Sequence, residues 1–266
     1  MRAHGCIDSA AGLGSDGHAC WGFDQPEEFV AAAVDFLEDG LRHGQRLAYV
    51  GSEPIEEQRE LLAPLGDVGR MVDSGMLQLF ELGHLYRLGE PVDPEAQMAV
   101  YLGATEAAQA EGYSGLRVAA QVTDLVAAPQ TWEAHLRWES TADRLLAPRS
   151  LAALCGYRRE AVPPQLLADL GAIHPAANEI AEIAPFHLFG EDGELALSGE
   201  VDHFSSEALE RVLGLATGDG EPASLNLEAL EFIDHHGAEV LARRGCRARN
   251  APPVVDRLCE LLELQL

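Results

Sequence analysis

Two His-x-Cys pairs near the N-terminus, His4 with Cys6 and His18 with Cys20, are residue types that could bind a metal. Four nitrogen and sulfur ligands complete a tetrahedral zinc site, and residues i and i+2 of an extended segment point to the same side. The spacing matches no standard zinc motif, however, and the first pair lies in a segment that we expect to be flexible. We therefore predict no metal site. For His18 and Cys20, with Trp21 beside them, the alternatives are the wall of a polar and aromatic pocket or plain packing.

Thiol chemistry is a second possibility for the cysteines and histidines. Cys20 or Cys155 could act as a nucleophile with His18 or His174 as its base. The sequence places none of these side chains next to one another and names no third group that would orient the base. A thiol-dependent enzyme is therefore kept as the alternative, and we expect a protein without catalytic residues and without a cofactor.

An adjacent histidine pair, His235 and His236, follows a strand-like run in LEFIDHHG. Asp234 is the expected N-cap of a helix, with His235, His236 and Gly237 in its first turn. Neighbouring residues diverge by about 100° around a helix, and the pair lacks the i, i+4 spacing of helical zinc motifs. We therefore predict an exposed docking surface made of Asp234, His235, His236 and Gly237, and no metal.

The charge balance limits the possible partners. The chain has 18 basic and 44 acidic residues and a net charge of −26, which would repel nucleic acid and anionic lipid. All the basic residues are arginine, so phosphate-loop and Schiff-base lysines are excluded. The five cysteines are scattered and odd in number, and no signal-like or membrane-spanning apolar run is found. These features predict reduced thiols and a cytoplasmic location.

The first 180 or so residues alternate between apolar strand-like runs and helix-like segments. Strands are predicted at 46–52, 76–82, 115–121 and 150–157, and helices at 24–41, 54–62, 93–111, 129–146 and 163–170. This order is typical of a mostly parallel sheet covered by helices on both faces.

Ligands of parallel sheets bind beyond the carboxyl ends of the strands, so we searched the residues that follow each predicted strand. The segment after Val50 contains no glycine-rich phosphate loop. The candidates beyond the strands are Ser52, Glu53, Glu81, Gln121, Thr123, Tyr157 and Arg158. The predicted ligand-binding residues are His18, Cys20, Trp21, Glu53, Glu81, Arg117, Gln121 and Tyr157. The alternative for any loop position among them is ordinary solvent exposure.

The pattern changes at residue 184, where FHLFGEDGELALSGEVD reads as a hairpin. A helix at 205–216, a strand at 223–227 and a final amphipathic helix in PPVVDRLCELLEL follow it. We therefore divide the chain into a flexible N-terminus at 1–16, an α/β domain at 17–183 and a small domain at 184–266. The linker is placed near residues 179–185.

Residues 187–264 resemble a STAS domain, the fold of anti-sigma factor antagonists, through LNLEALEFIDHHGAEVLARRG and NAPPVVDRLCELLEL. In phosphorylated members the loop reads Asp-Ser-Ser-Gly, and a partner kinase that is also the anti-sigma factor modifies the second serine. Asp234 and Gly237 match this loop, whereas His235 and His236 replace the serines. The resemblance implies an anti-sigma factor or serine-kinase-like partner, with the serine switch in doubt.

Residues 17–175 resemble a MEDS domain, a sensory module of methanogens and methylotrophs related to the RecA-like fold without its ATPase loop. The resemblance rests on GHACWGFDQPEEFVAAAVDFLEDGLRHGQRLAYVG, EGYSGLRVAAQVT and ALCGYRREAVPPQLLADLGAIHP. The combined resemblance, a pairing associated with actinobacteria, implies a RecA-like, mostly parallel sheet domain followed by a STAS-type α/β domain. We expect a non-enzymatic regulator that binds a small molecule, docks on a protein partner and could form a homodimer. A ligand-free scaffold is the other alternative.

Overall fold

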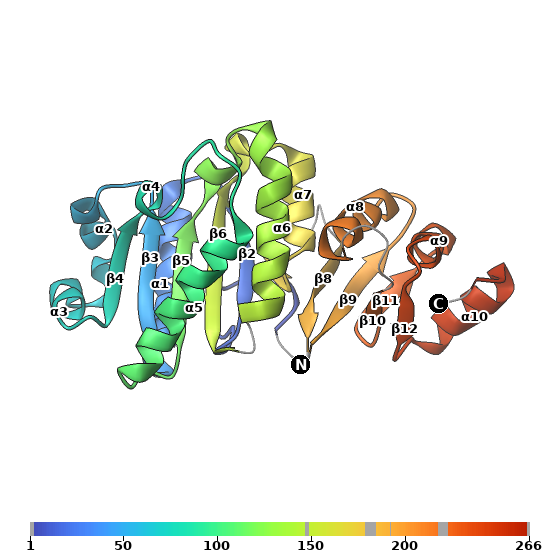
Figure 1. The fold of residues 1–266 in the computed structure, drawn as a ribbon, viewed down its shortest axis with the longest axis horizontal. Coiled ribbons are helices and arrows are strands. Elements are labelled where there is room, and N and C mark those ends of the chain that lie inside the picture. The colour runs from blue at the N-terminus through green and yellow to red at the C-terminus, as the bar shows by residue number, and fades with distance from the viewer. Residues whose placement is uncertain (1–2, 147–148, 179–184, 192, 218–222, 265–266) are drawn as a thin grey trace.

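The computed structural model describes residues 3–146, 149–178, 185–191, 193–217 and 223–264, which form two sheets side by side (Figure 1). The larger sheet belongs to the first part of the chain and the smaller one to the last part. Of the helices described, none is both long enough and apolar enough to cross a membrane.

The larger sheet has seven strands in the order β1-β7-β2-β6-β5-β3-β4, and every pair is parallel. Its strands are β1 Gly5–Cys6, β2 His18–Phe23, β3 Arg46–Gly51, β4 Leu77–Glu81, β5 Leu116–Gln121, β6 Leu151–Arg158 and β7 Ala176–Ala177. The predicted parallel α/β architecture of this region is confirmed.

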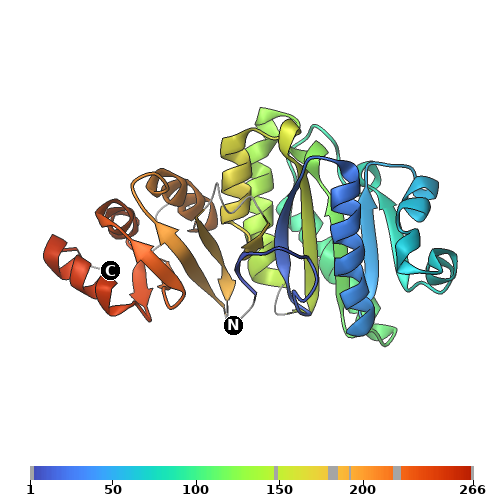
Figure 2. The ribbon, with the colours of Figure 1, turned by 180° about the vertical axis from the view of Figure 1, so that it is seen from behind.

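Helices cover both faces of this sheet. The helices are α1 Pro26–Arg42, α2 Ile55–Leu61, α3 Val68–Asp73, α4 Leu82–Leu85, α5 Pro94–Ala110, α6 Pro129–Leu146 and α7 Pro164–Ala172. Helices α5 and α6 lie over one face in Figure 1, and α1 lies over the other in Figure 2. Strand β5 shows the two-residue period that this requires, because Val118 and Ala120 pack in the core under α5 and α6 whereas Ala119 packs in the core under α1.

The interior strand β2, which lies between β7 and β6, is the main element that the sequence pattern did not predict. Its six residues, HACWGF, begin with a histidine and are separated from α1 only by Asp24 and Gln25, so the segment does not stand out as a separate apolar run. The stretch predicted to be flexible also differs, because β1 pairs with β7 and Ala10 and Leu13 are buried. Apolar contacts with α1 and the sheet therefore order residues of the lead-in.

The smaller sheet begins with the predicted hairpin, β8 Phe186–Glu191 and β9 Glu194–Val201, which pair antiparallel. Strands β10 Ser224–Asn226, β11 Leu230–Ile233 and β12 Arg247–Arg249 extend it in the order β11-β9-β10-β12. The helices of this part are α8 Ser206–Thr217, α9 His235–Arg243 and α10 Pro253–Leu262. Of the linker predicted at 179–185, residues 179–184 lie outside the described residues.

The two parts of the chain share one hydrophobic core, in which β8 packs against α6 and α7. Gly190 of β8 allows the closest approach, because a Cβ at this position would lie 2.8 Å from the Arg144 Cα of α6. A real Cβ never comes that close, so any larger residue would push β8 away from α6.

Candidate functional site

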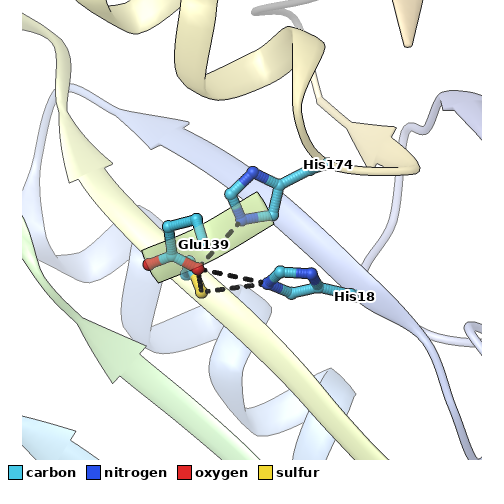
Figure 3. A group of neighbouring side chains, drawn as sticks. His18, Glu139 and His174 are labelled. Carbon is cyan, nitrogen blue, oxygen red and sulfur yellow. Dashed lines mark hydrogen bonds and ion pairs between the residues drawn. The ribbon is translucent and has the colours of Figure 1, made fainter. Parts of the chain in front are cut away.

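Four buried side chains from four different segments meet beneath α6. His18 begins β2, Glu139 lies in the middle of α6, Cys155 lies in β6, and His174 follows α7. Glu139 Oε2 lies 3.4 Å from His18 Nε2, 3.7 Å from His174 Nε2 and 3.6 Å from Cys155 Sγ (Figure 3). Cys155 Sγ also lies 3.6 Å from His18 Nε2. We call these four residues the His-Cys-Glu cluster.

Simple periodicities position these side chains. Strands β2 and β6 are neighbours, with Cys20 opposite Cys155, so His18 and Cys155 both point to the α6 face. On α6, His135, Glu139 and Asp143 follow one another at intervals of four residues and form one buried polar stripe. A polar stripe on the inward face of a helix is a sequence signal that indicates one wall of the site.

A second layer of contacts holds the cluster in place. His18 Nδ1 lies 3.1 Å from Asp143 Oδ1, and the other oxygen of Asp143 accepts a 2.7 Å hydrogen bond from the Gly190 backbone N–H. The Tyr157 hydroxyl donates to Glu139 Oε1 at 3.2 Å and lies 2.8 Å from His135 Nε2. These contacts therefore fix the orientations of the His18 and Glu139 side chains.

The histidines differ in their ionisation. His18 lies between two carboxylates, and although burial lowers its pKa, the bonds to Asp143 and Glu139 outweigh burial and raise it. Burial and the charge of His18 lower the pKa of His174 to about 3. His174 is therefore neutral at neutral pH, and of these two histidines His18 is the one that holds a proton more readily.

The acidic groups respond to the same surroundings. Burial disfavours the Glu139 carboxylate, but the hydrogen bond from His18 and the nearby histidines lower its pKa to about 2. Burial, and then the Glu139 charge, raise the pKa of Cys155 well above its ordinary value. Without a bound cation, Cys155 is a neutral thiol beside an ionised carboxylate.

A cavity of about 40 Å³ adjoins the cluster between the sheet and helices α5 and α6. Its polar end is formed by His18, Glu139, Asp143 and Cys155, and the rest of the lining is Tyr86, Tyr101, Val118, Ala120, Val122, Trp138, Ala142, Leu151 and Ala153. One water needs about 10–15 Å³ on this measure. The cavity therefore suits a molecule with roughly two or three heavy atoms, apolar on one side and polar on the other.

The structure brings only part of the predicted ligand-binding set to this cavity. His18 lines the cavity. Tyr157 does not line it but donates a hydrogen bond to Glu139, and Cys20 is buried on the same face of the sheet without lining the cavity. Cys155 and His174, considered initially only as enzyme residues, belong to the cluster, while Glu139 and Asp143 were not considered.

The other predicted residues lie elsewhere, because the cavity is on a face of the sheet and not at its carboxyl edge. Trp21 packs in the core under α1, and Arg117 is buried on that same side, where it donates to Gln45 and to backbone carbonyls. Glu53, Glu81 and Gln121 remain at the strand ends, where Ser52 donates to Gln121 and Asp124. Of the first His-x-Cys pair, His4 stacks on Phe189 and Cys6 contacts the Asn178 carbonyl, and among the described residues neither belongs to the group that contains His18.

The predicted docking loop adopts the expected helix start. Asp234 is the N-cap of α9 and accepts hydrogen bonds from the backbone N–H groups of His236 and Gly237. The ring centroids of His235 and His236 lie 3.8 Å apart, and those of His203 and His236 lie 4.5 Å apart. The neighbouring Phe204 is 90% exposed, which is unusual for a large apolar side chain.

Acid will destabilise the metal-free protein through His174. The folded-state pKa of His174 is about 3 whereas its ordinary value is 6.5, so below pH 6.5 the unfolded chain binds a proton that the folded chain does not. This loss of stability builds up as the pH falls and is complete near pH 3. The urea midpoint of His174→Gln should therefore fall less between about pH 7 and about pH 5 than that of the wild type.

The matched control for this prediction is His84→Gln, because the His84 side chain is 74% exposed. It should keep the wild-type pH dependence. If the urea midpoint of His174→Gln falls with pH as steeply as that of the wild type, His174 is not held neutral in the folded protein.

Comparison with known proteins identifies the part of the chain that contains this site. The family model described as MEDS, methanogen/methylotroph, DcmR sensory domain, matches residues 17–175, more than half of the 266 residues. All four residues of the His-Cys-Glu cluster and all the residues that line the cavity fall in this range. No curated protein matches the chain. The chain belongs to the MEDS family of sensory domains.

Proposed function

We propose that the chain is a non-enzymatic sensor in which a small molecule enters the cavity beside the His-Cys-Glu cluster and changes the C-terminal domain. The MEDS match supports a sensing role. The observation that carries the proposal is the position of Asp143, which bonds to His18 in the cavity wall and to Gly190 of β8. A ligand that moves His18 or α6 therefore acts directly on the second sheet.

A second contact between the site and β8 runs through His187. Its Nδ1 lies 2.9 Å from the carbonyl oxygen of His174 and 3.2 Å from that of Gly171. Both histidines of the cluster are thus connected to β8, one through a carboxylate and one through its own backbone. Paired contacts of this kind couple two sites when they differ between ligand-free and ligand-bound states.

For the output we propose docking of a protein partner on the start of α9, in the manner of an anti-sigma factor antagonist. The resemblance to STAS domains supports it, as do the N-cap at Asp234 and the exposed Phe204 beside the histidine rings. The positive end of the helix dipole favours a partner carboxylate or another anion here, beside Asp234, which already accepts from the His236 and Gly237 N–H groups. An anti-sigma factor or serine-kinase-like regulator is the partner class that we propose, in the cytoplasm.

A thiol-dependent enzyme is the alternative that a specific geometry favours. Cys155, His18 and Asp143 lie in the order of a nucleophile, a base and an orienting carboxylate. Glu139 opposes this role, because its charge and the burial of the site keep Cys155 as a thiol. The cavity of about 40 Å³ also leaves room only for very small substrates.

Hydrogen exchange on the full chain tests the proposal, with methanol and xenon as probes of the cavity. We expect either probe to slow exchange in α6 and β2 and to change exchange in β8 and at the start of α9. In Gly190→Ala the response of α6 should remain, whereas that of β8 and α9 should be lost because the new Cβ forces β8 away from α6.

Gly103→Ala is the matched control, because a Cβ at this position of α5 meets nothing within 4 Å. It should respond like the wild type. A response of α9 that survives in Gly190→Ala would contradict coupling through β8, and no response of α6 to either probe would contradict sensing in this cavity.

A further inference from the structure

We propose that the His-Cys-Glu cluster is a binding site for one divalent transition metal ion of the zinc class, held by His18 Nε2, Glu139 Oε2, Cys155 Sγ and His174 Nε2. The ligand atoms lie within 4.8 Å of one another, and all four residues are buried. This inference concerns the same site as the proposed sensor but does not depend on a cavity ligand.

The distances fit a coordination tetrahedron. Zinc bonds of about 2.0–2.3 Å to nitrogen, oxygen and sulfur place neighbouring ligand atoms about 3.3–3.8 Å apart. Four pairs of ligand atoms lie 3.4–3.7 Å apart. Glu139 Oε2 lies at such distances from His18 Nε2, His174 Nε2 and Cys155 Sγ, and Cys155 Sγ lies at such a distance from His18 Nε2. An ion at the centre would therefore reach its ligands with little movement of the side chains.

The tautomer of His174 independently points to a missing cation. Its Nδ1 lies 2.8 Å from the Leu170 carbonyl oxygen and must carry the proton, since a carbonyl can only accept. Nε2 then presents a lone pair toward Glu139 Oε2 at 3.7 Å, too far for a hydrogen bond and of the wrong polarity. Among the described residues this fully buried nitrogen has no hydrogen-bond partner.

The surroundings are those that metal ligands need. Metal-binding histidines usually donate their second N–H to a carboxylate or a carbonyl, and here His18 faces Asp143 while His174 faces Leu170. Tyr157 holds the other oxygen of Glu139, so that Oε2 alone points inward. One thiolate and one carboxylate balance the two positive charges of the ion. A mixed nitrogen, sulfur and oxygen set suits zinc and its first-row neighbours over magnesium or calcium.

The second candidate group, Asp234 with His235 and His236, does not share these features. It is partly exposed, and its three residues come from a single turn. It serves as the internal comparison in the experiment.

Cobalt(II) is the probe, because its absorption reports a thiolate ligand through a sulfur-to-metal charge-transfer band. We expect metal-free full-length protein without a histidine tag to bind one equivalent, to show this band, and to lose it when zinc is added. Cys155→Ser should remove the band, and His174→Ala should weaken binding at least 100-fold. Asp143→Asn should weaken binding about 10- to 100-fold, as is usual for outer partners of metal ligands.

The matched controls are Cys20→Ser, which changes the buried cysteine directly opposite Cys155, and the double variant His235→Ala/His236→Ala. Both should keep the band and the stoichiometry. Retention of the band in Cys155→Ser, or its loss in either control, would overturn the assignment. So would the absence of any band in folded wild-type protein.

X-ray absorption of the zinc-loaded wild type needs no variant and tests the ligand set directly. We expect one sulfur at about 2.3 Å and three nitrogen or oxygen neighbours at about 2.0–2.2 Å. A zinc shell without sulfur would overturn the site even if metal is bound. Repeating the methanol and xenon exchange with metal-free protein separates the two proposals, since a response without metal supports sensing alone.

Discussion

Replacing Glu139 with alanine will lower the free energy of unfolding of the metal-free protein by about 3–5 kcal/mol. Removing this carboxylate leaves His18, whose pKa the two carboxylates raise, with Asp143 alone, and it leaves Tyr157 without its acceptor. Loss of one partner from a buried charge network is costly because the remaining charge stays out of water. Urea unfolding followed by tryptophan fluorescence in the presence of a chelator measures it.

Two further variants separate charge from position. Glu139→Gln keeps the shape of the side chain and the hydrogen bond from Tyr157 but loses the charge. Its free energy of unfolding should therefore lie between those of the wild type and Glu139→Ala. Glu133→Gln on the same helix should change stability by less than about 0.5 kcal/mol, because its salt bridge with Arg137 is exposed. Equal effects of Glu133→Gln and Glu139→Ala would contradict a charged network beneath α6.

The order of elements could be predicted from the sequence because each strand between 46 and 158 is a short apolar run bounded by turns. The same approach failed for β2, where HACWGF begins with a histidine and is separated from α1 only by Asp24 and Gln25. His18 belongs to the His-Cys-Glu cluster, so the residue that makes β2 functional also interrupts its apolar pattern. The C-terminal elements were easier, since Asp234 caps α9 by purely local hydrogen bonds.

The candidate site could not be predicted because the search followed the carboxyl ends of the strands. Cys155 lies in the middle of β6 and Glu139 in the middle of α6, so their proximity depends on how the helix packs on the sheet. No local pattern encodes that packing. The four-residue spacing of His135, Glu139 and Asp143 on an otherwise amphipathic helix was the available signal, and it would have located one wall of the site.

Replacing Trp138 with alanine will enlarge the cavity and lower the free energy of unfolding by about 3–5 kcal/mol. Trp138 is 3% exposed, lines the cavity and stacks on Tyr101 with ring centroids 5.8 Å apart. Few neighbours can collapse into the space, because the opposite wall is the backbone-rigid strands β5 and β6. The control Trp132→Ala should cost less, because Trp132 is only partly buried and its Nε1 donates to the Val126 carbonyl near the start of the helix.

Indole, the ring removed by Trp138→Ala, will restore part of the lost stability if the cavity accepts apolar ligands. At ten times its Kd it should stabilise the variant by about 1.4 kcal/mol, since it binds the folded state alone. Wild type and Trp132→Ala should gain nothing, because the existing cavity of about 40 Å³ is too small for indole. Equal stabilisation of all three proteins would place indole at another site. Rescue confined to Trp138→Ala would show that the space beside the His-Cys-Glu cluster opens to small molecules from solution, which is the physical requirement of a sensor.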